Sequence, residues 1–440
     1  MGRCVGLDIH KRVVQVCILD PAGQVQAQTR LDCTLEALGA FAQAHLQRTD
    51  RIALEATTNT WSIVALLRPF VAEVVVSNPL RTQAIAQAKV KTDKVDARVL
   101  AELLRVGYLP EVWQPDPATQ QIRQLTSRRA GLVADRTTVK NRIHALLHVR
   151  LIPTPGTDLF SRQGLAWLKA LPLDDLGRAA LESELRLLAA MEQELQAMDA
   201  LITRYAWPDP RVKLLMTLPG IDVRTAQALL AAVGELARFP DADHLAAYLG
   251  LVPSTRQSAH KAFHGPITKH GNAHARWLLV QAAQSLARHP GPLGAFFQRL
   301  ARRKNRHVAI VACARKLATL AFHVLRNQEP YRYAKPTTTR VKLSRFRVRA
   351  SGQKRPTSLP TGIGAIASAR RIPALNELYA AESLPPARTP DQLPAGELNT
   401  LRRSGTLAFA RSVHTPHRVA GPTQAAAVQP QEAEEVQQGA

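Results

Sequence analysis

Residues 3–31 read RCVGLDIHKRVVQVCILDPAGQVQAQTRL and contain three short runs rich in apolar and β-branched side chains. The runs cover 3–9, 13–20 and 24–31, and each has the length of a β-strand. Pro21, Ala22 and Gly23 form a turn between the second and third runs. Because short turns join antiparallel neighbours, this stretch predicts an antiparallel meander of three strands.

The residues that follow alternate between helical and extended patterns. We expect helices at 35–47, from Trp61 and at about 82–105, with strands at 52–55 and 73–76. A three-strand meander followed by alternating helices and strands is the order of elements in a ribonuclease H-like fold. The sequence therefore predicts an α/β domain of this class at the N-terminus.

Two long helical patterns occupy the middle of the chain, at 118–151 and 174–205, and Pro153 and Pro155 interrupt the chain between them. This pattern predicts an antiparallel helical hairpin or a coiled-coil arm. Helices packed on the core of their own domain remain an equally good interpretation, and an arm would serve oligomerisation.

The remainder divides into a mostly α-helical unit and a compositionally biased tail. After about Tyr333 the chain is rich in Pro, Arg, Thr, Ala and Gln, and such a composition buries too little apolar surface to offset ordering entropy. We therefore expect a disordered tail. The predicted domains are 1–112 (metal-binding α/β domain), 113–206 (helical coiled-coil arm), 207–333 (mostly helical C-terminal domain) and 334–440 (tail).

The formal net charge of +24 and the pI of about 10.7 favour a polyanionic partner, DNA or RNA. A basic tail on a neutral protein is the alternative, but the tail carries only about a third of the excess. The four cysteines (Cys4, Cys17, Cys33 and Cys313) lack C-x-x-C spacing and are typical of small core residues in a reduced protein. No run of about 18 apolar residues indicates a membrane span, so we expect an intracellular protein.

Four acidic residues follow predicted strands or begin a predicted helix. Asp8 ends the first strand in VGLDIHK and Glu55 ends the fourth in IALEATT, whereas Asp93 and Asp96 lie three residues apart in KVKTDKVDARVL, where Thr92 can cap the helix. Clustered carboxylates need a cation or raised pKa values. One or two Mg²⁺ ions held by such oxygens could assist phosphodiester displacement.

These motifs resemble a known family. The N-terminal domain of the DEDD insertion-sequence transposases contains motifs similar to VGLDIHK, LEATTNTW and KTDKVDARVLAELL. This family includes the Piv-type DNA invertases, and its N-terminal domain is similar to RuvC resolvases. The resemblance implies that Asp8, Glu55, Asp93 and Asp96 are catalytic and bind Mg²⁺, with Mn²⁺ as a possible substitute. It covers roughly residues 5–333 and does not extend to the tail.

The C-terminal domain contains motifs that could contact nucleic acid. LMTLPGIDVRTAQALLAAVGE predicts two helices around a Pro219–Gly220 turn, either a DNA-binding helix-hairpin-helix or an ordinary helix pair. The next segment, AAYLGLVPSTRQSAHKAFHGPITKHGNAHARWLLVQAA, predicts a phosphate-facing loop, and its histidines fit no standard zinc site. The predicted nucleic-acid contacts are Gly220, Lys261, Lys269, Arg276, Arg302, Arg303, Lys304 and Arg306.

The last of these segments also resembles the second domain of the same transposases. By that resemblance, Ser258 falls at the nucleophilic serine and would form a 5′-phosphoserine link with DNA. Residue chemistry alone does not separate Ser258 from the nearby Ser254. The resemblance further implies a dimer or tetramer that brings DNA ends and target together, and a noncoding guide RNA, as in some members.

The leading hypothesis is therefore a transposase that cleaves and rejoins DNA strands. A RuvC-like nuclease that uses water, with Ser258 only binding phosphate, is the first alternative. A catalytically inactive nucleic-acid-binding remnant is the second, and the complete set of four acids argues against it.

Overall fold

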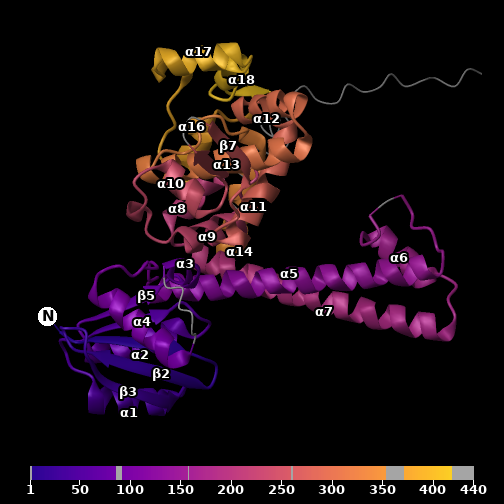
Figure 1. Cartoon of the computed structure of the whole chain (residues 1–440). Coiled ribbons are helices and arrows are strands. Elements are labelled where there is room, and N and C mark those ends of the chain that lie inside the picture. Colours follow the sequence, from indigo (N-terminus) through magenta and orange to yellow (C-terminus); the bar gives the residue numbers. More distant parts are fainter. Residues whose placement is uncertain (1, 86–91, 157, 259–260, 353–370, 419–440) are drawn as a thin grey trace, which may run out of the picture. The chain divides into compact units, whose positions relative to one another are not determined.

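The computed structural model describes residues 2–85, 92–156, 158–258, 261–352 and 371–418. The chain forms two compact units, Met1–Asp116 and Pro117–Ala440, each of which has its own core (Figure 1).

The first unit is a five-stranded mixed sheet with helices, and its strands fall within about a residue of the predicted ones. The sheet order is β3-β2-β1-β4-β5; β1, β2 and β3 pair antiparallel, and β1, β4 and β5 pair parallel. This is the predicted ribonuclease H-like pattern. Its elements are β1 (Cys4–Ile9), β2 (Val13–Leu19), β3 (Val25–Asp32), α1 (Leu35–His45), β4 (Arg51–Glu55), α2 (Thr60–Leu67), η1 (Arg68–Phe70), β5 (Glu73–Ser77), α3 (Pro79–Ile85) and α4 (Asp93–Arg105).

The two faces of this sheet are covered by different helices. Side chains alternate along β1, so Val5 and Leu7 enter the core shared with α1 and α2, whereas Cys4 enters the core shared with α4. Asp8 is in phase with Cys4. The alternation therefore directs Asp8 to the face of the sheet that α4 covers.

Predicted helix 82–105 is two separate helices, α3 and α4, and residues 86–91 between them lie outside the described part of the chain. Thr92 has an extended backbone (φ −142°, ψ 152°), which cannot continue a helix. Its side chain accepts a hydrogen bond from the Val95 N–H at 3.4 Å, which confirms the predicted cap. This cap fixes where Asp93 begins α4.

Gly6 allows α4 to lie unusually close to the sheet. A Cβ at this position would lie 1.9 Å from the carbonyl oxygen of Ala97 and 2.8 Å from the backbone nitrogen of Ala101. Both atoms belong to the α4 backbone, which cannot yield as a flexible side chain can. The glycine two residues before Asp8 therefore sets the separation between β1 and α4.

Replacing Gly6 by alanine is expected to destabilise the first unit by about 2–3 kcal/mol, the usual cost of forcing extra volume into a packed core. The change should be measured by urea unfolding of the full chain. Gly39 on α1 is the matched control, because a Cβ there meets nothing within 4 Å. Gly39→Ala should be neutral or stabilise by about 0.5–1 kcal/mol; equal losses for both variants would contradict this account of Gly6.

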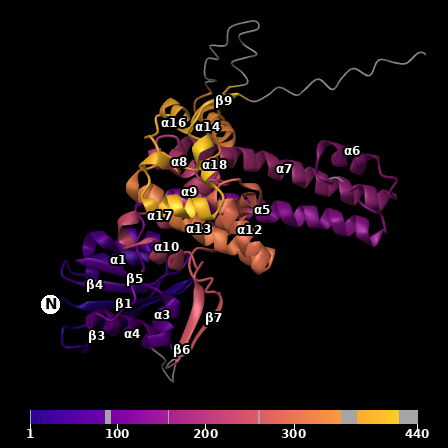
Figure 2. The ribbon, with the colours of Figure 1, turned by 90° about the horizontal axis from the view of Figure 1, so that it is seen from above.

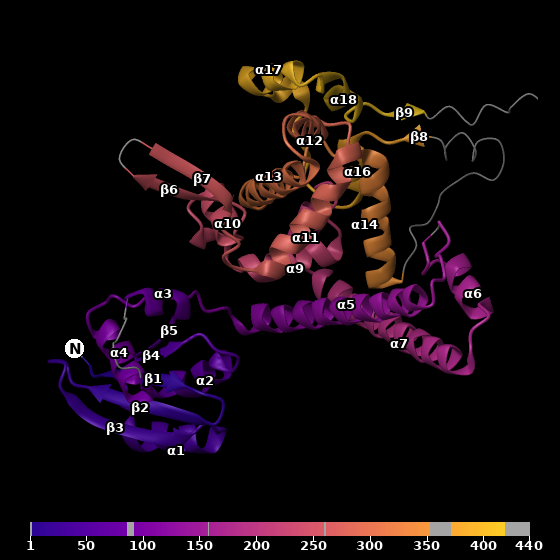
Figure 3. The same cartoon turned by 45° about the vertical axis from the view of Figure 1, so that its right-hand side comes forward.

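The second unit begins with the predicted antiparallel helical hairpin, formed by α5 (Pro117–Val149) and α7 (Asp175–Ala206), with the short α6 (Arg162–Ala170) between them (Figure 3). The buried leucine and isoleucine residues of α7 recur every seven positions, as in a coiled coil. They are Leu181, Leu188, Leu195 and Ile202. The ion pairs Arg129–Asp199, Arg136–Glu192 and Arg142–Glu184 join the two helices in antiparallel register.

The rest of the second unit is mostly helical, as predicted. The pair α8 and α9 encloses the Pro219–Gly220 turn, where Gly220 has φ +76°. The elements are α8 (Pro210–Met216), α9 (Val223–Val233), η2 (Leu236–Arg238), α10 (Ala242–Tyr248), β6 (Pro253–Ser258), β7 (Lys261–Ile267), α11 (Ala273–Gln284), η3 (Ser285–Arg288), α12 (Pro292–Arg303), α13 (Arg306–Asn327), α14 (Pro336–Ser351), β8 (Arg371–Ile372), α16 (Leu375–Ala381), η4 (Pro390–Gln392), α17 (Ala395–Arg403), α18 (Leu407–Ser412) and β9 (His417–Arg418).

One described helix, α13, has the length and hydropathy of a membrane span. Its most apolar window is 56% buried inside the protein, and Cys313, Leu317 and Phe322 lie in the main core of the second unit. The burial of α13 is therefore that of a helix in the core of the second unit.

The predicted phosphate-facing loop is partly a β-hairpin. β6 and β7 pair antiparallel, with Arg256 opposite Phe263 and Ser258 opposite Lys261. Figure 2 shows this hairpin projecting from the helical part of its unit. The two strands consist mainly of small, polar and glycine residues, so the sequence contains no alternating apolar face from which a strand could be predicted.

The prediction of a disordered tail from residue 334 is wrong for residues 334–352 and 371–418, which fold onto the second unit. Leu343, Phe346 and Tyr379 are buried in its main core. Lys342 is half-buried, and its Nζ donates to the carbonyls of Leu218 (2.7 Å) and Ile221 (3.1 Å) beside the Pro219–Gly220 turn. Burial lowers the pKa of Lys342 to about 8. Average composition concealed these few apolar residues among many polar ones. Residues 353–370 and 419–440 lie outside the described residues.

Candidate functional site

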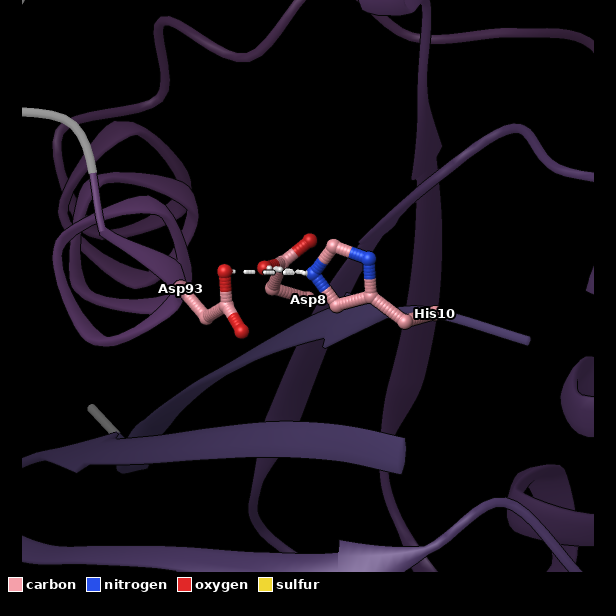
Figure 4. A group of neighbouring side chains, drawn as sticks. All are labelled: Asp8, His10 and Asp93. Atoms are coloured by element: carbon pink, nitrogen blue, oxygen red, sulfur yellow. Dashed lines mark hydrogen bonds and ion pairs between the residues drawn. The ribbon is translucent and has the colours of Figure 1, made fainter. Parts of the chain in front are cut away.

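The end of β1 and the first turn of α4 bring Asp8, His10 and Asp93 together (Figure 4). His10 Nε2 lies 3.0 Å from Asp8 Oδ2 and 3.4 Å from Asp93 Oδ1. One potential ligand atom from each residue lies within 4.8 Å of the other two. The Asp8 side chain is 16% exposed, whereas those of His10 and Asp93 are more than half exposed, so the group opens to solvent on one side.

The surroundings of Asp8 make its negative charge costly. Burial is the largest effect and raises the pKa of the Asp8 carboxyl; His10 opposes it, while the charges of Asp96 and Asp93 add to it. Asp96 is half-buried, one turn after Asp93 on α4. The structure thus places three of the four predicted acids within electrostatic reach of one another.

The fourth predicted acid, Glu55, ends the strand next to β1. Leu7 pairs with Leu54 in the parallel register, so Asp8 and Glu55 occupy equivalent positions at the ends of adjacent strands. Side chains alternate along β4, and Ala53 lies in the core beneath α4, so Glu55 belongs to the same face as Asp8. Adjacent strands are about 4.8 Å apart, which keeps the two acidic positions close.

His10 was not among the predicted site residues. It lies two positions beyond Asp8, where β1 has just ended, and its backbone N–H donates to the Val13 carbonyl in the β1–β2 turn. This turn brings the imidazole back over the carboxylates. The only signal in the sequence is the Asp-x-His spacing at a strand end, which is too short to be diagnostic.

These residues fit a divalent cation. Carboxylate oxygens are the ligands that Mg²⁺ and Mn²⁺ accept most readily, and an imidazole nitrogen can also serve as a ligand for transition metals. Burial raises the pKa of Asp8 and the charges of Asp96 and Asp93 add to this effect, so a bound cation would favour the ionised carboxylate. The residues able to hold the ion are Asp8, His10, Glu55, Asp93 and Asp96.

Comparison with known protein families agrees with this geometry. Residues 5–150 match a DEDD transposase family, and residues 212–298 match the transposase IS116/IS110/IS902 family. The matched ranges together cover more than half of the chain. The chain belongs to the IS110/IS116/IS902 family of DEDD transposases. The family is named for its four acidic positions, D-E-D-D, and these acids imply that its members bind a divalent metal ion.

Individual members of the family are similar to this chain over most of its described length. The transposase for insertion sequence element IS1111A of Coxiella burnetii is 26% identical over 75% of this chain and 91% of its own length. The pilin gene-inverting protein of Moraxella bovis is 28% identical over 74% of this chain and 97% of its own. A putative transposase of Sinorhizobium fredii, y4qE, is 29% identical, but the match covers only 59% of that protein.

The second family match contains the β6–β7 hairpin, and the structure separates its two serines. Ser258 is the last residue of β6, opposite Lys261, and residues 259 and 260 lie outside the described residues. Ser254 lies near the base of the hairpin, where its Oγ donates to the Pro266 carbonyl at 3.1 Å. A Cβ at Gly265 would lie 2.5 Å from that Oγ, so the Ser254 hydroxyl lies against the opposite strand.

The predicted nucleic-acid contacts of this transposase-family chain have different surroundings. Arg276 is used within the fold, because its Nη1 donates to the Leu249 carbonyl at 3.0 Å and the His270 carbonyl at 3.3 Å. Gly220 lies in the α8–α9 turn, and a Cβ there would lie 2.3 Å from the Ala282 carbonyl oxygen. The exposed cations are Lys261, Lys269, Arg302, Arg303, Lys304 and Arg306.

Proposed function

We propose that this protein is a transposase that cleaves and rejoins DNA strands, using the acidic residues of the first unit and a serine of the second. The acids are Asp8, Glu55, Asp93 and Asp96, and the serine is Ser258. The observation that carries the proposal is the convergence of Asp8 and Asp93 in the unit that matches the DEDD transposases. The +24 charge and the names of the relatives support DNA as the substrate.

The ion that we propose for this site is Mg²⁺, with Mn²⁺ as a substitute. When bound, such an ion stabilises negative charge on the oxygens of a phosphodiester undergoing displacement. The carboxylates hold and orient it, and the burial of Asp8 keeps one side of the site away from water. His10 lies between the two acids, because its Nε2 is within hydrogen-bond distance of Asp8 and within ion-pair distance of Asp93.

The proposed reaction has two transfers. Ser258 Oγ attacks the phosphorus, the new P–Oγ bond replaces the P–O3′ bond, the serine proton is lost to a base or to solvent, and the 3′ oxygen takes up a proton. In the second transfer, a 3′-hydroxyl attacks the 5′-phosphoserine and releases the serine. The hydrogen bond from the Ser254 hydroxyl to the Pro266 carbonyl of β7 favours Ser258 over Ser254 as the nucleophile.

We further propose that the protein works inside the cell as a dimer or tetramer on DNA ends and target, and that a noncoding RNA guides it. The large positive charge suits both nucleic acids. The α5–α7 hairpin supplies a coiled-coil surface for assembly, because Leu187 and Leu201 on α7 remain exposed.

The test is to purify the full chain with any RNA that co-elutes and to incubate it with DNA that carries the sequences flanking its gene. Addition of Mg²⁺ should produce a protein-linked 5′ end, and EDTA should prevent it. Free 5′-phosphate ends would support the water-using nuclease, and no metal-dependent cleavage would support an inactive remnant.

A further inference from the structure

The β6–β7 hairpin is basic and contains no acidic residue. No Asp or Glu occurs between Asp243 and Glu329, a stretch that contains thirteen Lys and Arg residues and the whole hairpin. Among the described ion pairs, none involves Arg256 or Lys261. A surface of this charge attracts a polyanion and repels another basic surface, such as a second copy of the same hairpin.

The hairpin also exposes an aromatic side chain. Phe263 is 66% exposed, and it lies directly opposite Arg256 in the antiparallel register. Cross-strand partners carry their side chains on the same face, with Cβ atoms about 5 Å apart. A flat apolar ring and a cation therefore stand side by side, two positions from the Ser258–Lys261 pair.

Neither residue is needed to hold the hairpin together. Its base is tied by backbone hydrogen bonds from Thr268 to Val252 and from Lys269 to Gly250, and by the bond from Ser254. Phe263 contributes little burial, and a two-stranded ribbon exposed in this way is marginal in water unless it is held at its base or covered by a ligand. A single exposed apolar residue is common and needs no explanation. An exposed ring beside a cation, on a hairpin without acidic residues, has the features of a surface that binds nucleic acid.

From this arrangement we propose that Phe263 stacks on an unpaired nucleobase next to the phosphate at which Ser258 acts, while Arg256 contacts the adjoining backbone phosphate. Every base offers a π-face, so aromatic stacking binds single strands with little dependence on sequence. Within a duplex the same faces are covered by neighbouring bases, so Phe263 selects a strand that is already separated. The inference rests on the proposed function, and it makes Phe263 a positioning residue.

The test uses the full chain, a labelled mixed-sequence DNA strand of about 20 nucleotides, longer than the common sites of about 4–16, and EDTA to prevent cleavage. Phe263→Leu keeps an apolar side chain but removes the ring, so the Kd for the single strand should rise about 5- to 100-fold. Phe263→Trp should bind within about twofold of the wild type, and its indole fluorescence should be quenched by the strand. The matched control is Tyr205→Leu, which removes an exposed ring from α7 and should leave the Kd unchanged.

Salt dependence separates the two roles. Arg256→Ala should reduce the slope of log Kd against log salt by about 0.7, the value for one phosphate contact on a single strand, whereas Phe263→Leu should weaken binding without changing the slope. Unchanged single-strand affinity for Phe263→Leu, or an equal loss with fully paired DNA, would overturn the inference and leave the proposed function standing. A change in oligomeric state without DNA would reassign Phe263 to a protein interface. Failure of the wild type to bind DNA at low salt would remove both proposals.

Discussion

Replacing Asp8 by asparagine is expected to reduce metal-dependent DNA cleavage at least about a thousandfold, since a bound cation supplies several kcal/mol of charge stabilisation to phosphoryl displacement. Asparagine has nearly the same shape and keeps one oxygen, so the side chain still fits beneath α4. What it removes is the charge that, with Asp93, attracts the ion. Cleavage should be followed with labelled DNA at saturating Mg²⁺.

The matched control is Asp32→Asn, which removes a carboxylate at the exposed end of the edge strand β3 of the same sheet. It should retain full activity. A second measurement separates lost metal binding from lost folding: Mg²⁺ or Mn²⁺ should raise the melting temperature of the wild type and of Asp32→Asn but not of Asp8→Asn. Asp8→Asn protein that cleaves within tenfold of the wild type would exclude Asp8 as a metal ligand.

The acidic part of this site could be predicted because it depends on strand ends. A carboxylate at the end of a buried strand lies where the strand leaves the sheet. The parallel pairing of β1 with β4 brings Asp8 and Glu55 to the same end of the sheet. Thr92 marked the start of α4, which fixes Asp93. The contribution of His10 could not be predicted, because it depends on the path of a tight turn rather than on periodicity.

The second unit was harder to predict for a similar reason. Its β6–β7 hairpin has no apolar face, so period-two alternation was missing and the segment was interpreted as a loop. In the tail, a long polar and proline-containing stretch separates Leu343 and Phe346 from Tyr379. They are buried only because they join the main hydrophobic core of the second unit, and composition does not show such long-range packing.

The second large effect is expected at the hairpin: Ser258→Ala should abolish the covalent protein–DNA link. Alanine has no side-chain oxygen that can bond to phosphorus, so the adduct should fall below detection. Binding of DNA measured in EDTA should stay within about tenfold, because the loss of one hydrogen bond costs about 1 kcal/mol. The adduct is measured on a denaturing gel with DNA labelled on the strand that retains the 5′ phosphate.

Ser254→Ala is the control that tests the choice between the two serines. Its Oγ is committed to the Pro266 carbonyl, so its loss should cost about 1 kcal/mol of hairpin stability and leave adduct formation within a few-fold of the wild type. The reverse pattern, with adducts lost in Ser254→Ala and kept in Ser258→Ala, would move the nucleophile to the base of the hairpin. Adducts that persist in both variants would contradict a unique nucleophilic serine, whereas free 5′-phosphate ends in Ser258→Ala would mean that the acids of the first unit can use water. Because Asp8→Asn should remove cleavage of every kind and Ser258→Ala only the covalent link, the two variants together separate the metal chemistry from the choice of nucleophile.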